Sequence, residues 1–334
     1  MKALLLKRYG PYEPTAFADI ARPTPKPDEL LVQVYAAGLN PVDNMILKGM
    51  FKPILPYRLP ITLGSDLAGV VVEVGSCVTR FKVGDAVFAN TFDRGDGAFA
   101  EFTRVPEALA APKPANLSFV EAASVPMVGL TSWQALKLRT NLQPGQKVFI
   151  PAGAGGIGTF AIQLAKHLGA KVGTTTSTGN VELVRSLGAD EVIDYKREKF
   201  ENVLRNYDAV LGTLKGDELE KALRVIKPGS TVISLVGPPD AAFARARGMN
   251  GLMQFVFGML SRSIISKAKK RGAEYSFFFA TPDGGQLAHI GELLTAGVLR
   301  PVIDKVFLFA EIKTALAYLD QGRAKGKVVV QMVN

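Results

Sequence analysis

The chain has 334 residues, of which 48% are hydrophobic, and this length predicts two globular domains. Cys77 is the only cysteine, which excludes an intramolecular disulfide and a multi-cysteine zinc site. The formal net charge is +10, but the basic residues are dispersed apart from one cluster, so we expect a solvated, phosphate-attracting surface and no specific nucleic-acid partner.

The composition also bears on the compartment. No run of the sequence reaches the roughly 18 apolar residues of a membrane-spanning helix, and no membrane partner is expected. Residues 1–7 are similar to the start of a secretory signal, but the apolar run is too short and leads directly into a strand-like segment. Because there is a single cysteine, a reducing cytoplasm is the expected location.

The first part of the chain has the pattern of a β-rich domain. Residues 30–36 alternate as in a sheet that is open to water on one face, and prolines and glycines divide the segment into short pieces. Strands are predicted over residues 3–6, 30–36, 64–74, 83–88 and 97–102. Many short strands with this punctuation predict a compact, barrel-like β domain.

The pattern changes near residue 118. Ser118 and Glu121 have the spacing of a capping box, which predicts a helix over 119–125, and residues 129–136 look like the start of another helix. From residue 147 strands and helices alternate, which predicts a doubly wound parallel sheet. Its strands are expected at 147–150, 171–175, 191–194, 208–212, 231–236 and 275–279.

The first of these strands runs into a glycine-rich turn and then a helix. Gly153, Gly155 and Gly158 match the pattern Gly-x-Gly-x-x-Gly in the strand–turn–helix context that this motif requires. One glycine permits the turn, one lets backbone N–H groups approach a pyrophosphate, and one lets the helix pack close to the strand. The helix N-terminus adds free N–H groups and a positive dipole end. We therefore predict that a dinucleotide is bound by Gly153, Ala154, Gly155, Gly156, Ile157 and Gly158.

The residues after the second parallel strand indicate which dinucleotide is bound. An NAD site usually has an acid here, about 20 residues after the turn, for the ribose 2′-hydroxyl. The sequence has Thr176, Ser177 and Thr178 instead, which suit a 2′-phosphate that a carboxylate would repel. Tyr195 and the two basic residues after it could add a hydroxyl and positive charge. These features favour NADPH, although ordinary turn residues would give the same run of hydroxyls.

Residues 241–272 interrupt the alternation of strands and helices. The stretch 249–265 is rich in Met, Phe, Leu and Ile. The basic cluster follows it and comprises Lys267, Lys269, Lys270 and Arg271. A helix on a membrane surface would give this pattern, but we favour a helix pair that packs over the active-site cleft or against a second subunit.

The C-terminal segment returns to a strand–helix pattern. Helices are predicted over 284–296 and 310–320, and strands over 302–307 and 327–332. We expect these two strands to return to the first domain and complete its sheet.

The assembled motifs resemble one known family over essentially the whole chain. They are residues 38–43, 64–71, 129–131, 152–158 with Gln163 and Lys166, 186–190 with Asp194 and Tyr195, and 326–329. The chain resembles a zinc-independent medium-chain dehydrogenase/reductase of the NADPH:quinone oxidoreductase and alkenal/one (enone) oxidoreductase branch.

This resemblance implies an α/β protein of two domains. A GroES-like, β-rich catalytic domain is expected over 1–125 with 298–334, and a Rossmann domain that binds NADPH over 126–297. The resemblance also implies a homodimer and a small electrophilic acceptor, either an enone or a quinone.

The zinc ligands of the alcohol dehydrogenases in this superfamily are missing. In those relatives the position matching Asn40 is a cysteine, and the pair matching Ser65 and Asp66 is His-Glu. His167 and His289 lie outside any ligand spacing, and a catalytic zinc normally needs three protein ligands. We therefore expect no metal. Quinones and α,β-unsaturated carbonyls accept a hydride without a Lewis acid, which favours their reduction over alcohol oxidation.

The resemblance implies roles for single residues. Asn40 and Asp43 are expected near the nicotinamide with Thr131 nearby, and Lys327 is expected to reach towards the nucleotide. Further cofactor contacts are expected from Val236, Gly237 and Phe278.

Departures from the family pattern leave the proton donor open. Met45 and Phe51 stand where some relatives have tyrosines, so Tyr57 is the nearest remaining phenol, although packing is the plainer role for it and water is another donor. Asn180 replaces a frequent lysine, which removes one positive partner for a 2′-phosphate. The alternative functions are one-electron quinone reduction of the ζ-crystallin type, and a cofactor-binding accessory or structural protein with little turnover.

Overall fold

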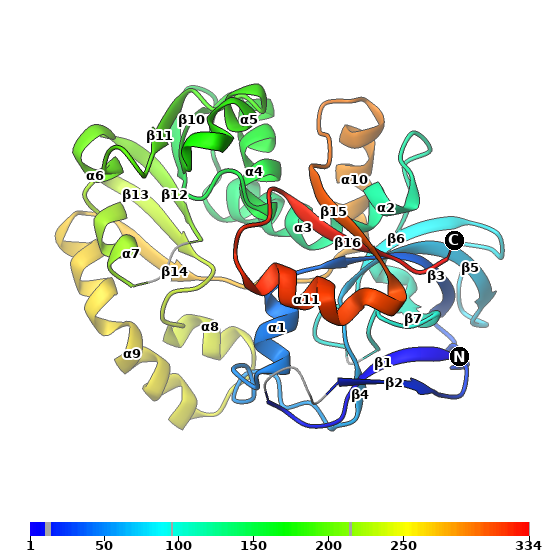
Figure 1. Ribbon diagram of the computed structural model, residues 1–334. Coiled ribbons are helices and arrows are strands. Elements are labelled where there is room, and N and C mark those ends of the chain that lie inside the picture. The colour runs from blue at the N-terminus through cyan, green and yellow to red at the C-terminus, as the bar shows by residue number, and fades with distance from the viewer. Residues whose placement is uncertain (11–14, 95, 214–215, 334) are drawn as a thin grey trace. The chain divides into compact units, whose positions relative to one another are not determined.

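The chain forms two compact units in the computed structural model, which describes residues 1–10, 15–94, 96–213 and 216–333 (Figure 1). Unit 1 comprises Met1–Leu130 with Thr281–Asn334, and unit 2 comprises Thr131–Ala280. The predicted Rossmann domain extends to residue 297, whereas unit 2 ends earlier. The difference arises because helix α10 (Gly284–Thr295) packs against strand β8 (Ala110–Pro112) of unit 1.

Unit 1 is built on a seven-stranded sheet with the order β15-β16-β3-β5-β6-β8, in which β7 also pairs with β3. Its strands are β3 (Glu29–Leu39), β5 (Asp66–Val74), β6 (Ala86–Asn90), β7 (Phe102–Pro106), β8, β15 (Ile303–Leu308) and β16 (Lys327–Gln331). The predicted return of the C-terminal strands is confirmed, because β16 runs antiparallel to β3. A second sheet has the order β2-β1-β4, with β2 (Thr15–Asp19), β1 (Lys2–Leu6) and β4 (Ile61–Thr62).

The strand predicted at 97–102 is wrong. Strand β7 begins only at Phe102, and the residues before it cross from one sheet to the other. A Cβ on Gly97 would lie 2.1 Å from the carbonyl oxygen of Leu63, and Ala100 makes an isolated bridge to Ala3. The segment that predicts a strand here contains the buried residues Ala98, Phe99 and Ala100, which lie outside any named strand.

The helices of unit 1 follow turn and capping signals. They are α1 (Pro41–Leu47), α2 (Phe119–Ala123), α10, α11 (Ile312–Asp320) and the greater part of α3 (Pro126–Trp133). The capping box predicted for α2 is confirmed, because the Glu121 N–H donates to Ser118 Oγ (3.2 Å) and the Ser118 N–H donates to Glu121 Oε2 (2.8 Å). Helix α3 begins before the predicted residue 129, since Pro126 suits the first turn.

Unit 2 contains a six-stranded parallel sheet with the order β11-β10-β9-β12-β13-β14, which confirms the predicted doubly wound sheet. The strands are β9 (Lys147–Ile150), β10 (Lys171–Thr176), β11 (Glu191–Asp194), β12 (Tyr207–Gly212), β13 (Ile226–Ser234) and β14 (Glu274–Phe277). Strand order reverses at β9, which lies between β10 and β12. Ligands of such sheets bind at the carboxyl ends of the strands beside this reversal.

Helices of unit 2 include α4 (Gly156–His167), α5 (Val181–Ser186), α6 (Phe200–Val203), α7 (Asp217–Ala222), α8 (Ala241–Ala246) and α9 (Gly251–Lys270). The predicted helix pair in the insertion is confirmed, since α8 and α9 pack on each other beside β14 (Figure 1). Within the described residues, no helix is both long enough and apolar enough to cross a membrane.

Candidate active site

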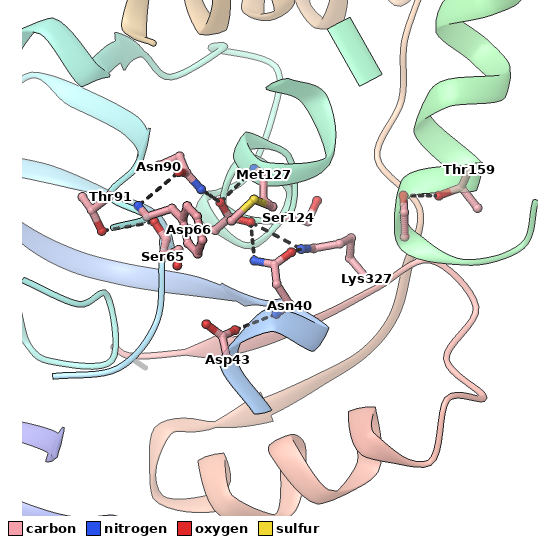
Figure 2. A network of polar contacts seen from close by, with 12 residues as sticks. Asn40, Asp43, Ser65, Asp66, Asn90, Thr91, Ser124, Met127, Thr159 and Lys327 are labelled. Carbon is pink, nitrogen blue, oxygen red and sulfur yellow. Dashed lines mark hydrogen bonds and ion pairs between the residues drawn. The ribbon is translucent and has the colours of Figure 1, made fainter. Parts of the chain in front are cut away.

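A buried carboxylate, Asp66, is the centre of a polar network in unit 1 (Figure 2). Its Oδ2 accepts hydrogen bonds from Asn40 Nδ2 (2.9 Å) and Lys327 Nζ (3.3 Å). Its Oδ1 accepts from Asn90 Nδ2 (2.7 Å) and from the backbone N–H of Met127 (2.8 Å). A buried charge is tolerated only when it is paired and hydrogen-bonded, and Asp66 meets both conditions.

The topology of the sheet brings these side chains together. Strands β16, β3, β5 and β6 are neighbours, and Lys327 and Asp66 begin their strands while Asn90 ends its own. Asn40 follows directly after β3 as the N-cap of α1, and the register pairs Gly38 with Asp66. A Cβ on Gly38 would lie 2.2 Å from the carbonyl oxygen of Ala123, so the glycine is required for helix α2 to lie this close.

Lys327 is buried and its ammonium group is held by two side chains of its own unit. Its Nζ donates to Asn40 Oδ1 at 2.5 Å and contacts Asp66. Burial lowers the pKa of Lys327, and the carboxylates of Asp66 and Asp43 oppose that shift. The predicted reach of Lys327 towards the nucleotide stays a prediction, while its direct contacts show that it orients the Asn40 amide.

Asp43 lies one helical turn beyond Asn40 and completes a capping box. Its Oδ2 accepts the backbone N–H of Asn40 at 2.7 Å. Its Oδ1 is buried and has no hydrogen-bond partner among the residues that the structure describes. Burial raises the pKa of Asp43 to about 7, against the lowering effect of the Asn40 N–H, with a further raising contribution from Asp66. The carboxyl therefore titrates in the physiological range.

Tyr57 lines a small cavity of unit 1. Its side chain is half-buried. The cavity is lined by Ile46, Tyr57, Ile61, Thr62, Leu63, Gly64, Ser65, Thr91, Asp93 and Gly97. The catalytic role of Tyr57 stays a prediction, as do those of Asn40 and Asp43.

The glycines in the turn of unit 2 differ in how closely other atoms surround them. A Cβ on Gly153 would lie 2.1 Å from Thr174 Oγ1, and a Cβ on Gly158 would lie 2.5 Å from the carbonyl oxygen of Ala152. Both are therefore required by packing within the protein. A Cβ on Gly155 would meet only the carbonyl oxygen of Ala152, at 3.3 Å, so no bulky neighbour requires a glycine there.

Gly155 is also the N-cap of α4 and provides no side-chain cap for the first turn. The N–H groups at the start of a helix need partners, and a phosphate is a suitable acceptor. The open space over Gly155 and the uncapped turn therefore fit a dinucleotide pyrophosphate. Ala154, Gly156 and Ile157 lie in the same segment, as predicted, although their contacts to a cofactor stay a prediction.

The hydroxyl run lies at the carboxyl end of β10, directly beside β11. Thr176 ends β10 and pairs with Asp194, and the exposed Tyr195 follows. Thr178 Oγ1 donates to Asp194 Oδ2 at 2.6 Å, and Arg197 Nε lies 3.4 Å from the same oxygen. The Thr178 hydrogen bond is the first cause of a lowered pKa for Asp194, so this carboxylate is ionised and already paired.

The remaining predicted cofactor residues of unit 2 differ in accessibility. The Gly237 N–H donates to Ser234 Oγ at 2.9 Å, directly after Val236 and beyond the end of β13. Phe278 is 2% exposed and its ring lies under the Arg139 guanidinium, 4.9 Å from the carbon to the ring centre. Thr131 is buried at the start of the unit. Phe278 therefore has little exposed surface for contact with a cofactor.

Known proteins are similar to this chain over its whole length. Family models described as "Alcohol dehydrogenase GroES-like domain" and "Zinc-binding dehydrogenase" match residues 26–115 and 187–330. A 2-methylene-furan-3-one reductase of Solanum lycopersicum is 35% identical over 100% of this chain and 79% of its own length. The chain belongs to the medium-chain dehydrogenase/reductase family.

Further relatives specify the branch of this medium-chain dehydrogenase/reductase. An NADPH-dependent alkenal/one oxidoreductase of Arabidopsis thaliana is 36% identical over 99% of this chain and 79% of its own length. The solved quinone oxidoreductase from Coxiella burnetii is 30% identical, with a TM-score of 0.87 over 100% of this chain and 99% of that one. The chain lies in the zinc-independent quinone and alkenal/one oxidoreductase branch, as its motifs predict.

Asn40 and Asp66, which the family resemblance matches to zinc-site positions of other dehydrogenases, belong to the polar network here. Asn40 and Asp66 are joined by the Lys327 ammonium, which supplies a positive charge between them. In the described part of the chain, no group of three or more His, Cys, Asp or Glu side chains is placed to hold a metal ion.

Sequence reasoning missed the central residue of this site. In the sequence prediction Asp66 appears within the family motif 64–71 and as a substituted zinc-ligand position, and Asn90 does not appear. A carboxylate at the first position of an apolar strand was the available signal, because a buried carboxylate needs partners. Asp194 was likewise missed as the partner of Thr178 and Arg197.

Proposed function

We propose that this protein is an NADPH-dependent oxidoreductase that reduces the C=C bond of an α,β-unsaturated carbonyl compound or a quinone. The names of its relatives, an alkenal/one oxidoreductase, a 2-methylene-furan-3-one reductase and quinone oxidoreductases, support this substrate class. The observation that carries the proposal is the turn at Gly155, which leaves backbone N–H groups and open space for a pyrophosphate.

The residues of unit 2 would hold the cofactor. The N–H groups of the α4 first turn would bind its pyrophosphate, and Ser177 and Tyr195, with the buried Thr176 beside them, would hold a 2′-phosphate. When bound, the reduced nicotinamide supplies a hydride, and this chemistry belongs to the cofactor. The protein supplies orientation and a dry environment.

NADPH rather than NADH is supported by the charges near β10. The end of β10 carries hydroxyl groups, and the nearest carboxylate, Asp194, is paired with Thr178 and Arg197. Lys196 and Arg197 add positive charge beside this carboxylate. A 2′-phosphate would therefore meet donors and cations there, whereas the carboxylate of Asp194 is already paired and less available to a 2′-hydroxyl.

The reduction of an enone also consumes a proton, which neutralises the enolate. Asp43 would hold a proton near neutral pH because burial raises its pKa to about 7. Lys327 and Asp66 act as positioning residues, since they fix the Asn40 amide next to the Asp43 helix turn. The alternative proton donors are a water molecule and Tyr57. If a variant that lacks the Asp43 carboxyl keeps its turnover, one of these donates the proton.

A panel of acceptors tests the proposed function. NADPH oxidation is followed with benzoquinones, short enals, cyclic enones and enoyl thioesters, and with simple ketones as the matched control. We expect turnover with quinones or enones and none with the ketones. Reduction of ketones alone, or no turnover with any acceptor, would contradict the proposal.

Two further expectations belong to the proposal. A cytoplasmic location follows from the single cysteine, and a homodimer follows from the family resemblance. Fractionation of cells and sedimentation equilibrium test them.

A further inference from the structure

Helix α9 is attached to unit 2 by one side only. Its buried residues Phe257, Ser261, Ile264 and Ala268 recur at helical spacing, and Ile264 and Ala268 belong to the hydrophobic core that includes Val232 of β13. The Phe257 ring stacks near Phe243 of α8 at a centroid distance of 6.5 Å. The side of such a helix that faces away from the core is usually polar along its whole length, but the N-terminal half of α9 departs from this.

The N-terminal half of the opposite side is apolar. Five large side chains are exposed there, with exposed fractions from 38% for Val256 to 70% for Leu252. They are Leu252, Phe255, Val256, Met259 and Leu260. Their spacing puts them on one continuous surface of the helix, which we call the α9 apolar face. Contiguous exposed apolar patches mark interaction sites.

The C-terminal half of the same helix is basic. Arg262, Lys269 and Lys270 line a hollow together with Gly258, Ile265 and Ser266. No aspartate or glutamate occurs between Gly251 and Arg271. Lys267 is paired with Glu220 of α7, so the local positive charge comes from the three cations that line the hollow and from the exposed Arg271.

We propose that α9 docks this protein on an anionic lipid surface. The α9 apolar face would enter the boundary between headgroups and acyl chains, and Arg262, Lys269 and Lys270 would bind lipid phosphates. Interfacial helices combine large apolar side chains with Lys and Arg in this way. Peripheral docking needs no spanning helix. The exposed apolar side chains of α9 support the interpretation of residues 249–271 as a helix on a membrane surface.

The distribution of charge disfavours a second copy of α9 as the occupant. If two such helices paired in the same direction, the basic halves would face each other and repel. If they paired in opposite directions, the basic half of each would cover the apolar half of the other and lose its hydration without gaining a counter-charge. An anionic lipid surface satisfies both halves at once.

Vesicle flotation with the full-length protein tests the proposal without substrate or cofactor, so its outcome is independent of the proposed function. The probes are vesicles of phosphatidylcholine alone and of phosphatidylcholine mixed with phosphatidylglycerol. We expect the affinity for the anionic vesicles to be at least about tenfold higher than that for the neutral vesicles. This affinity should fall when the salt concentration is raised, because screening reduces the range of electrostatic attraction.

Matched variants separate the two halves of the helix. Arg262→Gln with Lys269→Gln and Lys270→Gln should lower anionic binding roughly fivefold for each charge removed. The control Lys82→Gln with Lys313→Gln and Arg323→Gln removes the same charge from exposed positions elsewhere and should change little.

The apolar half has its own pair of variants. Phe255→Ser with Met259→Ser should lower vesicle binding about tenfold or more, because burial of each side chain is lost. The control Val83→Ser with Leu308→Ser removes exposed apolar side chains from unit 1 and should bind as before.

Three results would overturn the proposal. They are equal binding to neutral and anionic vesicles, an equal loss in the two charge triples, and a dimer that dissociates in the Phe255→Ser, Met259→Ser variant while vesicle binding is unchanged. The last result would assign the α9 apolar face to a second copy. The comparison of the two vesicles with the unmodified protein stands even if a variant does not fold.

Discussion

Asp43 is a carboxyl group whose surroundings oppose its ionisation. Burial raises its pKa to about 7 from an ordinary value of 3.8. Between these values the folded protein retains a proton that the unfolded chain has released. The free energy of unfolding therefore falls as the pH rises through this window, by up to about 4 kcal/mol at neutral pH and above. Below pH 3.8 both states are protonated and the contribution is fully present.

Asp43→Asn removes this titration while its side-chain oxygen can still accept the Asn40 N–H. As the pH rises from about 4 to about 7, the free energy of unfolding of the variant should increase relative to that of the parent, because only the parent has to bury a charge. Urea unfolding at a series of pH values measures this difference. If the two stability curves run parallel across the window, the raised pKa of Asp43 is wrong.

The Asp66–Lys327 pair is a second feature at this scale. Removing one buried charge leaves the other without a partner, which typically costs about 3–5 kcal/mol. We therefore expect Asp66→Asn and Lys327→Met each to lower the free energy of unfolding by such an amount. The double variant should lose less than the sum, and a strictly additive double variant would show that the two groups do not interact.

Individual site residues could be predicted only as far as local motifs reach. The Asn40 and Asp43 positions follow from the segment after β3, and the Gly153 turn from its spacing. The contact of Lys327 with Asn40 spans 287 residues of sequence and depends on β16 joining β3. No local pattern contains that pairing, so neither the contact of Lys327 with Asn40 nor the central place of Asp66 in the network could be predicted.

At the scale of elements, substitutions of Gly153 and Gly155 in the turn before α4 should have opposite effects on stability and on NADPH binding. Gly155→Val should keep the free energy of unfolding within about 1 kcal/mol, because no bulky neighbour fills the space over Gly155. It should nevertheless weaken NADPH binding about tenfold or more, since the side chain occupies the space of the pyrophosphate.

Gly153→Val is the matched control. Its Cβ would lie 2.1 Å from Thr174 Oγ1, so it should destabilise the fold by about 1–3 kcal/mol or more. Urea unfolding and fluorescence titration with NADPH measure both variants. Undiminished NADPH binding by Gly155→Val would rule out the phosphate role of the turn.

The end of β10 makes a prediction about cofactor choice. NADPH should bind at least about tenfold more tightly than NADH to the unmodified protein. Ser177→Asp introduces a carboxylate that repels a 2′-phosphate, and should remove most of this preference, whereas the uncharged Ser177→Asn should keep it. Calorimetric titration with both nucleotides measures the ratio. Equal affinities in the unmodified protein would contradict our interpretation of residues 176–180.

Element positions could be predicted well where the hydrophobic period was clear. The parallel strands occur at the predicted places, because each is a short apolar run bounded by helices. Strand β13 begins at Ile226, earlier than predicted, since Pro228 disfavours a strand. The sheet accommodates this stretch through a register shift between β12 and β13.

At the scale of the whole molecule, the family of the chain and the fold class of each unit could be predicted from the sequence. Motifs from residue 38 to residue 329 agree on one architecture, and the β-rich unit 1 and the parallel sheet of unit 2 have it. The surface of α9 could not be predicted in the same way. Its apolar residues have the period of a core helix, and only the structure reveals that Phe257 and Leu252 face opposite sides.

The central claim is that a nicotinamide hydride passes to an enone or quinone without a metal ion. Transfer of deuterium from NADPH that carries deuterium at both C4 positions to a cyclic enone tests it most directly. The protein is first dialysed against a strong chelator, and the product is analysed by mass spectrometry and NMR. We predict a single deuterium at the β-carbon of the saturated ketone, at a rate that the chelator does not change. Unlabelled product, or turnover that stops on chelation and returns with zinc, would contradict the account.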